Sequence, residues 1–243
     1  MRSRQTLFVA KLLNNAGKGL IILLHGAPGT GKTSTAECVA ELCKRPLYPI
    51  TCGDLGTTAV EVEIFLRILE YYQGILFLTT NRVGKMDEAF RSRVHVSLYY
   101  PPLTEKSTID IFETNLKRIK VQKGSILRIK EDDIRKFAKA HYKDHEEHVR
   151  WNGRQIRNAF HIAVALAENE VKKIKSSGEG TKSSRPTLRK KHFRKVEEAS
   201  TKFDEYLTSV LGMGQSERAR EKAYRQDSWR EGSCLRLFFY PYL

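Results

Sequence analysis

Residues 26–33 read Gly-Ala-Pro-Gly-Thr-Gly-Lys-Thr and directly follow an apolar run, Leu20–Leu24. The glycines allow successive backbone N–H groups to turn inward around phosphates, Lys32 can reach the β and γ phosphates, and the Thr33 hydroxyl can bind Mg²⁺. A strand over residues 19–25 and a helix over 33–44 are expected to flank this loop, so the phosphates would also meet a helix N-terminus. The pattern predicts a nucleoside triphosphate site with these contact residues: Gly26, Ala27, Pro28, Gly29, Thr30, Gly31, Lys32, Thr33 and Ser34.

Strand-like and helix-like segments alternate over the first hundred residues, which is typical of a parallel sheet with helices on both faces. The expected strands are Gly19–His25, Leu47–Thr51, Ile75–Thr79 and Val94–Tyr99. From Thr104 onward the apolar spacing is helical only, and Pro101-Pro102 marks the boundary between the two regions. The predicted fold class is therefore α/β, a P-loop NTPase core followed by an all-α domain.

The chain has 243 residues and a net charge of +15, with 43 Lys and Arg against 28 Asp and Glu. Such a charge favours the binding of polyanions, but it gives no specificity by itself.

The four cysteines form no CxxC pair and no metal-ligand spacing, so reduced thiols are expected. No apolar run approaches the roughly 20 residues needed to cross a bilayer. We therefore expect a cytoplasmic or nuclear protein, with the mitochondrial matrix as a weaker alternative because Met1–Asn15 is basic.

Two further motifs follow the third expected strand. Asn81 stands directly after Ile75–Thr80, and residues 86–93 read Met-Asp-Glu-Ala-Phe-Arg-Ser-Arg. Together with the phosphate loop, these residues resemble the AAA+ ATPases, and most closely a group of AAA proteins from filamentous fungi. The resemblance covers roughly residues 17–210 and implies an ATP-dependent, ring-forming protein that remodels another protein or complex.

The resemblance also assigns roles to individual residues. Asn81 corresponds to sensor 1, whose amide can hold the attacking water, and the alternative is an Asn that closes the strand by an Asx-turn. Arg93, or else Arg91, corresponds to an arginine finger that reaches the neighbouring subunit, and the alternative is a solvated helix end. In the helix that begins near Trp151, Arg157 corresponds to the sensor 2 arginine that contacts the nucleotide, with Arg154 as a substitute.

Two other features remain open at this level. His141, His145 and His148 have helical spacing that would align three imidazoles, but their neighbours are charged and the HExxH spacing of zinc proteases is absent. Residues 171–195 hold seven lysines and three arginines, so this basic loop is either a solvated linker or a contact for nucleic acid or acidic lipid.

The sequence lacks an expected element. P-loop ATPases normally carry a strand of four apolar residues ending in Asp-Glu, the Walker B element, which supports Mg²⁺ and activates the attacking water. Residues 55–74 instead read as one continuous helix, and Asp54 is not a credible substitute. The junction near Glu63-Ile64 resembles a deletion, natural or from an incomplete gene model, and it predicts impaired hydrolysis and a sheet that lacks one strand.

The expected organisation has six parts. They are a helical extension at 1–16, the core at 17–102, a helical lid at 103–174, the flexible basic loop at 175–192, a helix packing on the lid at 193–211, and a charged, poorly ordered tail at 212–243. The expected function is an ATP- and Mg²⁺-binding AAA+ core that assembles into a homo-oligomeric ring. The alternatives are a non-catalytic nucleotide-gated module whose basic loop binds nucleic acid or an acidic partner and, ranked last, a small-molecule kinase. A GTPase is disfavoured because Asn81-Arg82-Val83-Gly84 does not match NKxD.

Overall fold

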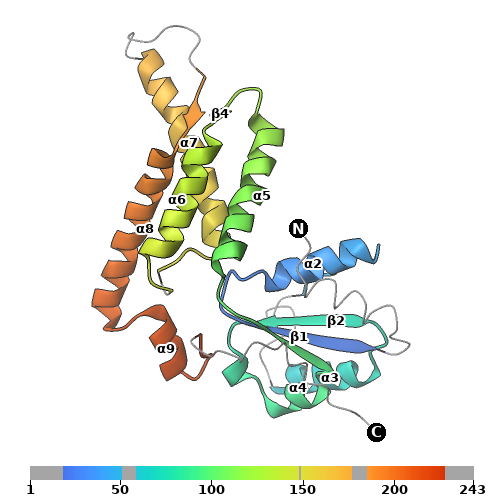
Figure 1. The fold of residues 1–243 in the computed structure, drawn as a ribbon. Helices are drawn as coiled ribbons and strands as arrows, with labels where there is room; N and C mark the ends of the chain where they lie inside the picture. The colour runs from blue at the N-terminus through green and yellow to red at the C-terminus, as the bar shows by residue number, and fades with distance from the viewer. Residues whose placement is uncertain (1–18, 51–58, 148, 177–184, 228–243) are drawn as a thin grey trace. The chain divides into compact units, whose positions relative to one another are not determined.

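The computed structural model describes residues 19–50, 59–147, 149–176 and 185–227. These residues form two units, one ending at Pro101 and resuming at Ala219, the other spanning Pro102–Arg218 (Figure 1). The first unit holds the sheet and is called the core. The second holds most of the long helices and is called the lid. The expected N-terminal extension lies outside the described residues.

The core sheet has three parallel strands in the described residues, in the order β2-β1-β3. Strand β1 (Leu20–Gly26) lies between β2 (Ile75–Thr80) and β3 (Val96–Tyr100). Its residue His25 is in register with Thr80 on one side and Tyr99 on the other. Because parallel strands end at the same edge, the phosphate loop after β1, the Asn81 turn after β2 and the end of β3 meet there.

Helices cover both faces of this sheet. Helix α2 (Lys32–Leu42) places Val39 against Ile22, Leu24 and Leu98 on one face. Helices α3 (Ala59–Tyr71) and α4 (Glu88–Arg93) cover the other face, where Leu69 meets Ile21 and Leu23 (Figure 1). Both faces of β1 are buried, which explains its uninterrupted apolar sequence.

One expected strand is wrong. Leu47–Ile50 forms no strand, and Leu47, Tyr48 and Ile50 are exposed. Thr51 lies outside the described residues. A strand needs a neighbour to satisfy its backbone groups, and no strand in the described part of the chain stands between this segment and β2 to provide one. The other three expected strands are present within a residue or two of their expected bounds.

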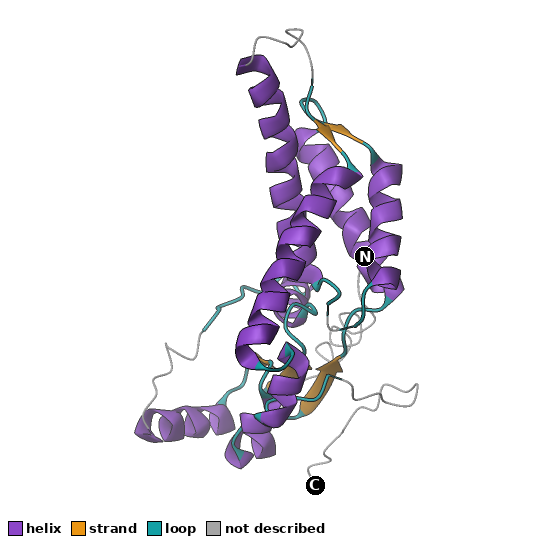
Figure 2. Ribbon diagram, turned by 90° about the vertical axis from the view of Figure 1, so that its left-hand side faces the viewer, coloured by secondary structure: helices purple, strands orange, loops and turns teal. Residues whose placement is uncertain are grey.

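The lid is a bundle of four helices, coloured purple in Figure 2: α5 (Glu105–Lys123), α6 (Glu131–Asp144), α7 (Gly153–Ser176) and α8 (Lys190–Leu211). Each helix packs on two others, so the four enclose one core. Four fully buried phenylalanine rings occupy its centre: Phe112, Phe137, Phe160 and Phe193. Five of the six ring pairs have centroids 4.9–6.3 Å apart. A short parallel pair, β4 (Arg128–Ile129) with β5 (Thr187–Leu188), joins the loops that precede α6 and α8.

The caps of the lid helices explain where they begin. The Thr104 hydroxyl accepts a hydrogen bond from the Ser107 N–H, so α5 begins after it. At α7, the Asn152 side chain accepts from the Gln155 N–H while the Gln155 side chain accepts from the Asn152 N–H. This reciprocal capping box fixes the start of α7 at Gly153.

No helix among the described residues combines the length and apolarity that a membrane span requires.

The segment after the lid differs from the expected charged and poorly ordered tail. Residues 215–221 form helix α9 (Gln215–Glu221), and residues 219–227 belong to the core unit. Tyr224 accepts a hydrogen bond from the Gly84 N–H in the turn η1 (Val83–Lys85). That expectation is wrong for residues 215–227, because they include the helix α9 and because Tyr224 contacts the segment after β2 through its backbone carbonyl and its ring. Residues 228–243 lie outside the described residues.

The aromatic centre of the lid gives the first prediction. Phe193 and Phe203 both lie on α8, but Phe193 is 0% exposed and Phe203 is 59% exposed. Phe193→Ala should lower the free energy of unfolding of the lid by about 3–5 kcal/mol because it leaves a cavity among the rings. Phe203→Ala, the matched control, should change it by less than about 0.5 kcal/mol. Urea unfolding measures both, followed by the fluorescence of Trp151 in chains whose other tryptophan, Trp229, is replaced by Phe. Equal losses would contradict this packing.

Candidate nucleotide-binding site

The loop between β1 and α2 has the backbone geometry of a phosphate cradle. Gly29 and Gly31 adopt φ values of +73° and +99°, which side-chain-bearing residues rarely adopt. Gly31 is the N-cap of α2, and no side chain caps that helix end. The first N–H groups of α2 therefore remain available to an anion, at the positive end of the helix dipole.

Lys32 lies against the loop. Its Nζ donates to the carbonyl oxygens of Gly26, at 3.0 Å, and of Ala27, at 2.6 Å, and the residue is 9% exposed. Burying an ammonium is costly unless it is paired, and carbonyl oxygens are weaker partners than phosphate oxygens. The arrangement places the Lys32 ammonium in the loop, next to an N-terminus of α2 that its N-cap residue, Gly31, does not cap with a side chain.

A buried hydrogen-bond chain ties the loop to β3. The Tyr100 hydroxyl donates to Thr35 Oγ1 at 2.8 Å, and Thr35 Oγ1 donates to the Gly31 carbonyl at 3.0 Å. Burial raises the pKa of Tyr100, while its bond to Thr35 acts in the opposite direction. The sequence analysis did not single out Thr35 or Tyr100, because their contact joins residues 65 positions apart.

His25, immediately before the loop, also has an altered electrostatic environment. Burial lowers its pKa, and the positive charge of Lys32 lowers the pKa further. Its ring lies 5.5 Å from the ring of Tyr99. The core therefore favours the neutral form of the His25 ring.

The structure brings Asn81 to the same edge of the sheet as the phosphate loop. Asn81 directly follows β2, whose last residue, Thr80, is in register with His25. The side chain that closes the turn is that of Thr80, which accepts from the Arg82 N–H. Asn81 is exposed, and the contacts among the described residues give its amide no such turn role. The described contacts therefore show no Asx-turn at Asn81, and its role as sensor 1 stays a prediction.

The two candidate arginine fingers differ. The Arg93 guanidinium bonds to Glu70 of α3 and, at 2.7 Å, to the Ala89 carbonyl. Arg91 is exposed near the end of α4. Arg93 therefore links α3 to α4 within the chain, and Arg91 is the arginine that faces solvent.

The sensor 2 candidates lie in the lid. Arg154 and Arg157 are both exposed and belong to the first turns of α7. The capping box at Asn152 fixes where this helix starts and so fixes both positions on it. Their proposed contact with nucleotide stays a prediction.

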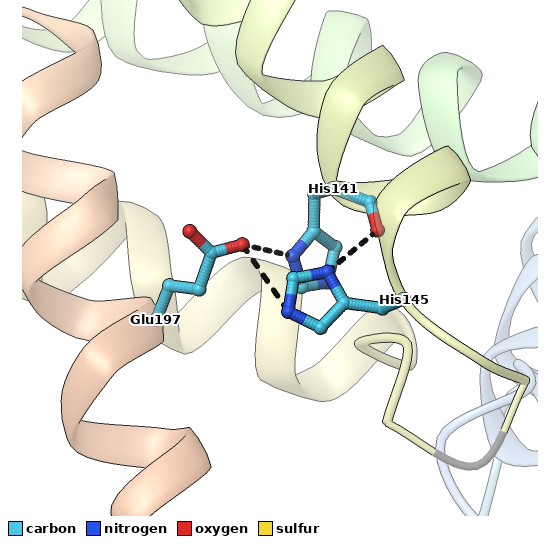
Figure 3. Close-up of side chains that lie close together, drawn as sticks. All are labelled: His141, His145 and Glu197. Carbon is cyan, nitrogen blue, oxygen red and sulfur yellow. Dashed lines mark hydrogen bonds and ion pairs between the residues drawn. The ribbon is translucent and has the colours of Figure 1, made fainter.

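The histidine cluster is built as a structural contact in the lid (Figure 3). His141 Nε2 accepts from the Trp151 N–H at 3.2 Å, so its Nδ1 carries the proton and donates to Glu197 at 2.6 Å. A metal on Nδ1 would have to displace that proton. His145 Nδ1 donates to the His141 carbonyl, its Nε2 lies 3.8 Å from Glu197, and His148 lies outside the described residues. The geometry favours a link between α6 and α8 over a metal site.

A separate hollow of about 200 Å³ lies in the lid between α5 and α7. Arg118, His161 and Phe160 are among its lining residues, and the pair Lys123–Glu168 borders it. It offers no glycine-rich backbone for phosphate, so the nucleotide site is assigned to the loop after β1.

Comparison with known families agrees with this geometry. The family model described as "ATPase family associated with various cellular activities (AAA)" matches residues 22–70, and that of the "Fungal AAA+ ATPase lid domain" matches residues 103–213. The chain belongs to the AAA+ ATPases, with an AAA+ core followed by a helical lid. No individual curated protein matches the chain.

Solved structures show the same fold at low sequence identity. The AAA domain of FIGL-1 in complex with ADP has 17% identity and a TM-score of 0.55, over 86% of this chain and 84% of that one. RuvB of Thermotoga maritima, described as a Holliday junction branch migration motor, has 14% identity and a TM-score of 0.56, over 92% and 80%. A katanin structure concerned with self-assembly has 14% identity and a TM-score of 0.55, over 82% of each chain.

The effect of Lys32 on His25 is testable. Lys32→Met should raise the pKa of His25, because it removes the positive charge, while the larger effect of burial remains. Histidine ring titration by NMR measures the change, with the signal assigned by His25→Gln. Lys85→Met, which removes an exposed lysine, should leave the His25 pKa unchanged. An unchanged pKa in Lys32→Met would show that the ammonium does not lie beside His25.

Proposed function

We propose that the core binds ATP through the loop at residues 26–34. The observation that supports this most directly is Lys32, a nearly buried cation held only 2.6 Å from a loop carbonyl beside an uncapped helix N-terminus. A triphosphate would offer anionic oxygens to Lys32 in place of the loop carbonyls, and it would accept hydrogen bonds from the N–H groups at the start of α2. The FIGL-1 domain, which shares this fold, was solved with ADP.

We propose that Mg²⁺ accompanies the nucleotide at Thr33. This residue follows Lys32 in the first turn of α2 and is exposed. A hydroxyl oxygen is a suitable ligand for Mg²⁺, which takes most of its remaining ligands from phosphates and water.

Hydrolysis should be weak. The strands of the described core sheet end in His-Gly, Thr-Thr and Tyr-Tyr, so none of them delivers an Asp or Glu to the edge where the phosphates would bind. Two other carboxylates of the core have contacts of their own: Asp87 caps α4, and Glu70, in the last turn of α3, binds Arg93. Asn81 remains to position a water, but no carboxylate among the described strand ends can deprotonate it.

We also propose that the chain assembles into a homo-oligomeric ring in which Arg91 is the arginine finger. An exposed arginine at the end of a short helix can reach a neighbouring subunit's nucleotide, whereas Arg93 is already bound to Glu70. This reverses the order of the two candidates suggested by the sequence. That ATP hydrolysis is coupled to remodelling of a protein or complex is proposed from the family resemblance alone.

Titration calorimetry with Mg²⁺ and ATP tests the nucleotide proposal, with steady-state phosphate release measured on the same samples. Lys32→Ala should weaken ATP binding by about tenfold to a hundredfold, which corresponds to the loss of a charged hydrogen bond of about 1.5–3 kcal/mol. Phosphate release should be close to background in both proteins.

Lys85→Ala is the matched control, because it removes an exposed lysine of the same core, and it should bind ATP normally. Absence of ATP binding by the unmodified chain would overturn the proposal. Rapid phosphate release that depends on Lys32 would show that a carboxylate outside the described strand ends performs the chemistry.

A further inference from the structure

The outer edge of β2 is open in the part of the chain that the structure describes. β2 pairs with β1 on one side, and no described strand pairs with its other side. The Gly74 carbonyl accepts from the Leu20 N–H, so Gly74, Leu76 and Leu78 face β1. Because backbone groups alternate along a strand, the N–H groups of Ile75, Phe77 and Thr79 face outward.

This edge carries none of the features that normally block strand addition. Residues 75–80 read Ile-Leu-Phe-Leu-Thr-Thr, with no charge and no proline. Ile75 and Phe77 contribute to the apolar cluster on one face, Leu76 and Leu78 to the cluster on the other, and all four remain only partly buried. An uncharged, apolar, unpaired edge is a template for another strand.

The chain returns to this part of the core after the lid. The Gly84 N–H, four residues beyond β2, donates to the Tyr224 carbonyl at 3.0 Å. The Arg82 guanidinium lies 4.6 Å from the centroid of the Tyr224 ring. A side chain at Gly84 would lie 1.9 Å from the Ala223 carbonyl, so only glycine permits this approach. The described chain ends three residues later, at Asp227, after an ion pair between Arg225 and Asp227.

The remaining sequence has a matching composition. Residues 235–240 read Leu-Arg-Leu-Phe-Phe-Tyr, a strand-prone run of the same length as β2. Leu235, Leu237 and Phe239 would lie on one side of such a strand, and Arg236, Phe238 and Tyr240 on the other. One side would be apolar and the other would carry a single charge, which suits an edge strand of a sheet covered by helices on both faces. Seven residues, 228–234, connect Asp227 to this run, and a chain of that length can span at most about 23 Å. A six-residue strand such as β2 is about 20 Å long, so the linker can reach any point along its edge.

We propose that residues 235–240 of this chain bind the outer edge of β2. The return segment docks just beyond the carboxyl end of β2, so the added strand would run antiparallel to β2. It would satisfy the outward N–H groups of Ile75, Phe77 and Thr79 and cover the apolar border of the sheet.

Hydrogen exchange on the full chain, followed residue by residue by NMR, tests this pairing. The Ile75, Phe77 and Thr79 amides should be protected in the full chain and should exchange at least about tenfold faster in a chain that ends at Asp227. The Leu76 and Leu78 amides face β1, so they should keep their protection in both and serve as internal controls.

A pair of point variants separates strand pairing from mere loss of the tail. Leu237→Pro removes a backbone donor within the run and should reproduce the fast exchange. Gly232→Pro lies before the run and should not. If the chain ending at Asp227 loses protection at Leu76 and Leu78 as well, it has unfolded, and the comparison of these two proline variants decides.

Three results would overturn the proposal. Unprotected outward amides in the full chain would mean that the edge is free. Protection that survives both truncation and Leu237→Pro would mean that another segment covers it. Protection that rises with protein concentration would mean that a second copy pairs with the edge.

Discussion

The placement of β1 between two parallel partners is the constraint on which the core depends. It sets the ends of all three described strands at one edge, and the loop after β1 must turn there into α2. The Tyr100–Thr35–Gly31 chain then fixes this turn from β3, and Lys32 fixes it from within through two carbonyls. The loop is therefore held by two sets of hydrogen bonds before any ligand binds, which would lower the entropic cost of binding.

Local patterns in the sequence predicted much of the described fold correctly. The glycines and lysine of the loop depend only on neighbouring residues, and the lid helices follow from apolar spacing and from caps such as Asn152 with Gln155. The strand expected at Leu47–Ile50 failed for a non-local reason, because its apolar residues had no neighbouring strand to pair with. Contacts across long stretches of sequence, such as Arg93 with Glu70, could not be predicted from either segment alone.

The same reasoning bears on the missing Walker B element. The three-stranded sheet and the exposed Ile64 (55%) and Ile68 (54%) on α3 are consistent with a core that lacks a neighbouring element beside β2. Whether that element was deleted stays a prediction. In either case the described core keeps the loop that we propose binds phosphate, and none of its described strands ends in a carboxylate that would activate water. On this proposal, binding and hydrolysis depend on different strands and are separable.

The most direct measurement of the central claim is a titration of the ¹⁵N-labelled chain with Mg²⁺ and ATP, followed through the backbone amide signals of the loop. The account predicts large, saturable shifts at Gly29, Gly31, Lys32 and Thr33, with no change at Gly212 and Gly214 at the end of the lid. Absence of shifts at the four loop residues at saturating ATP would contradict the assignment of this loop as the nucleotide site.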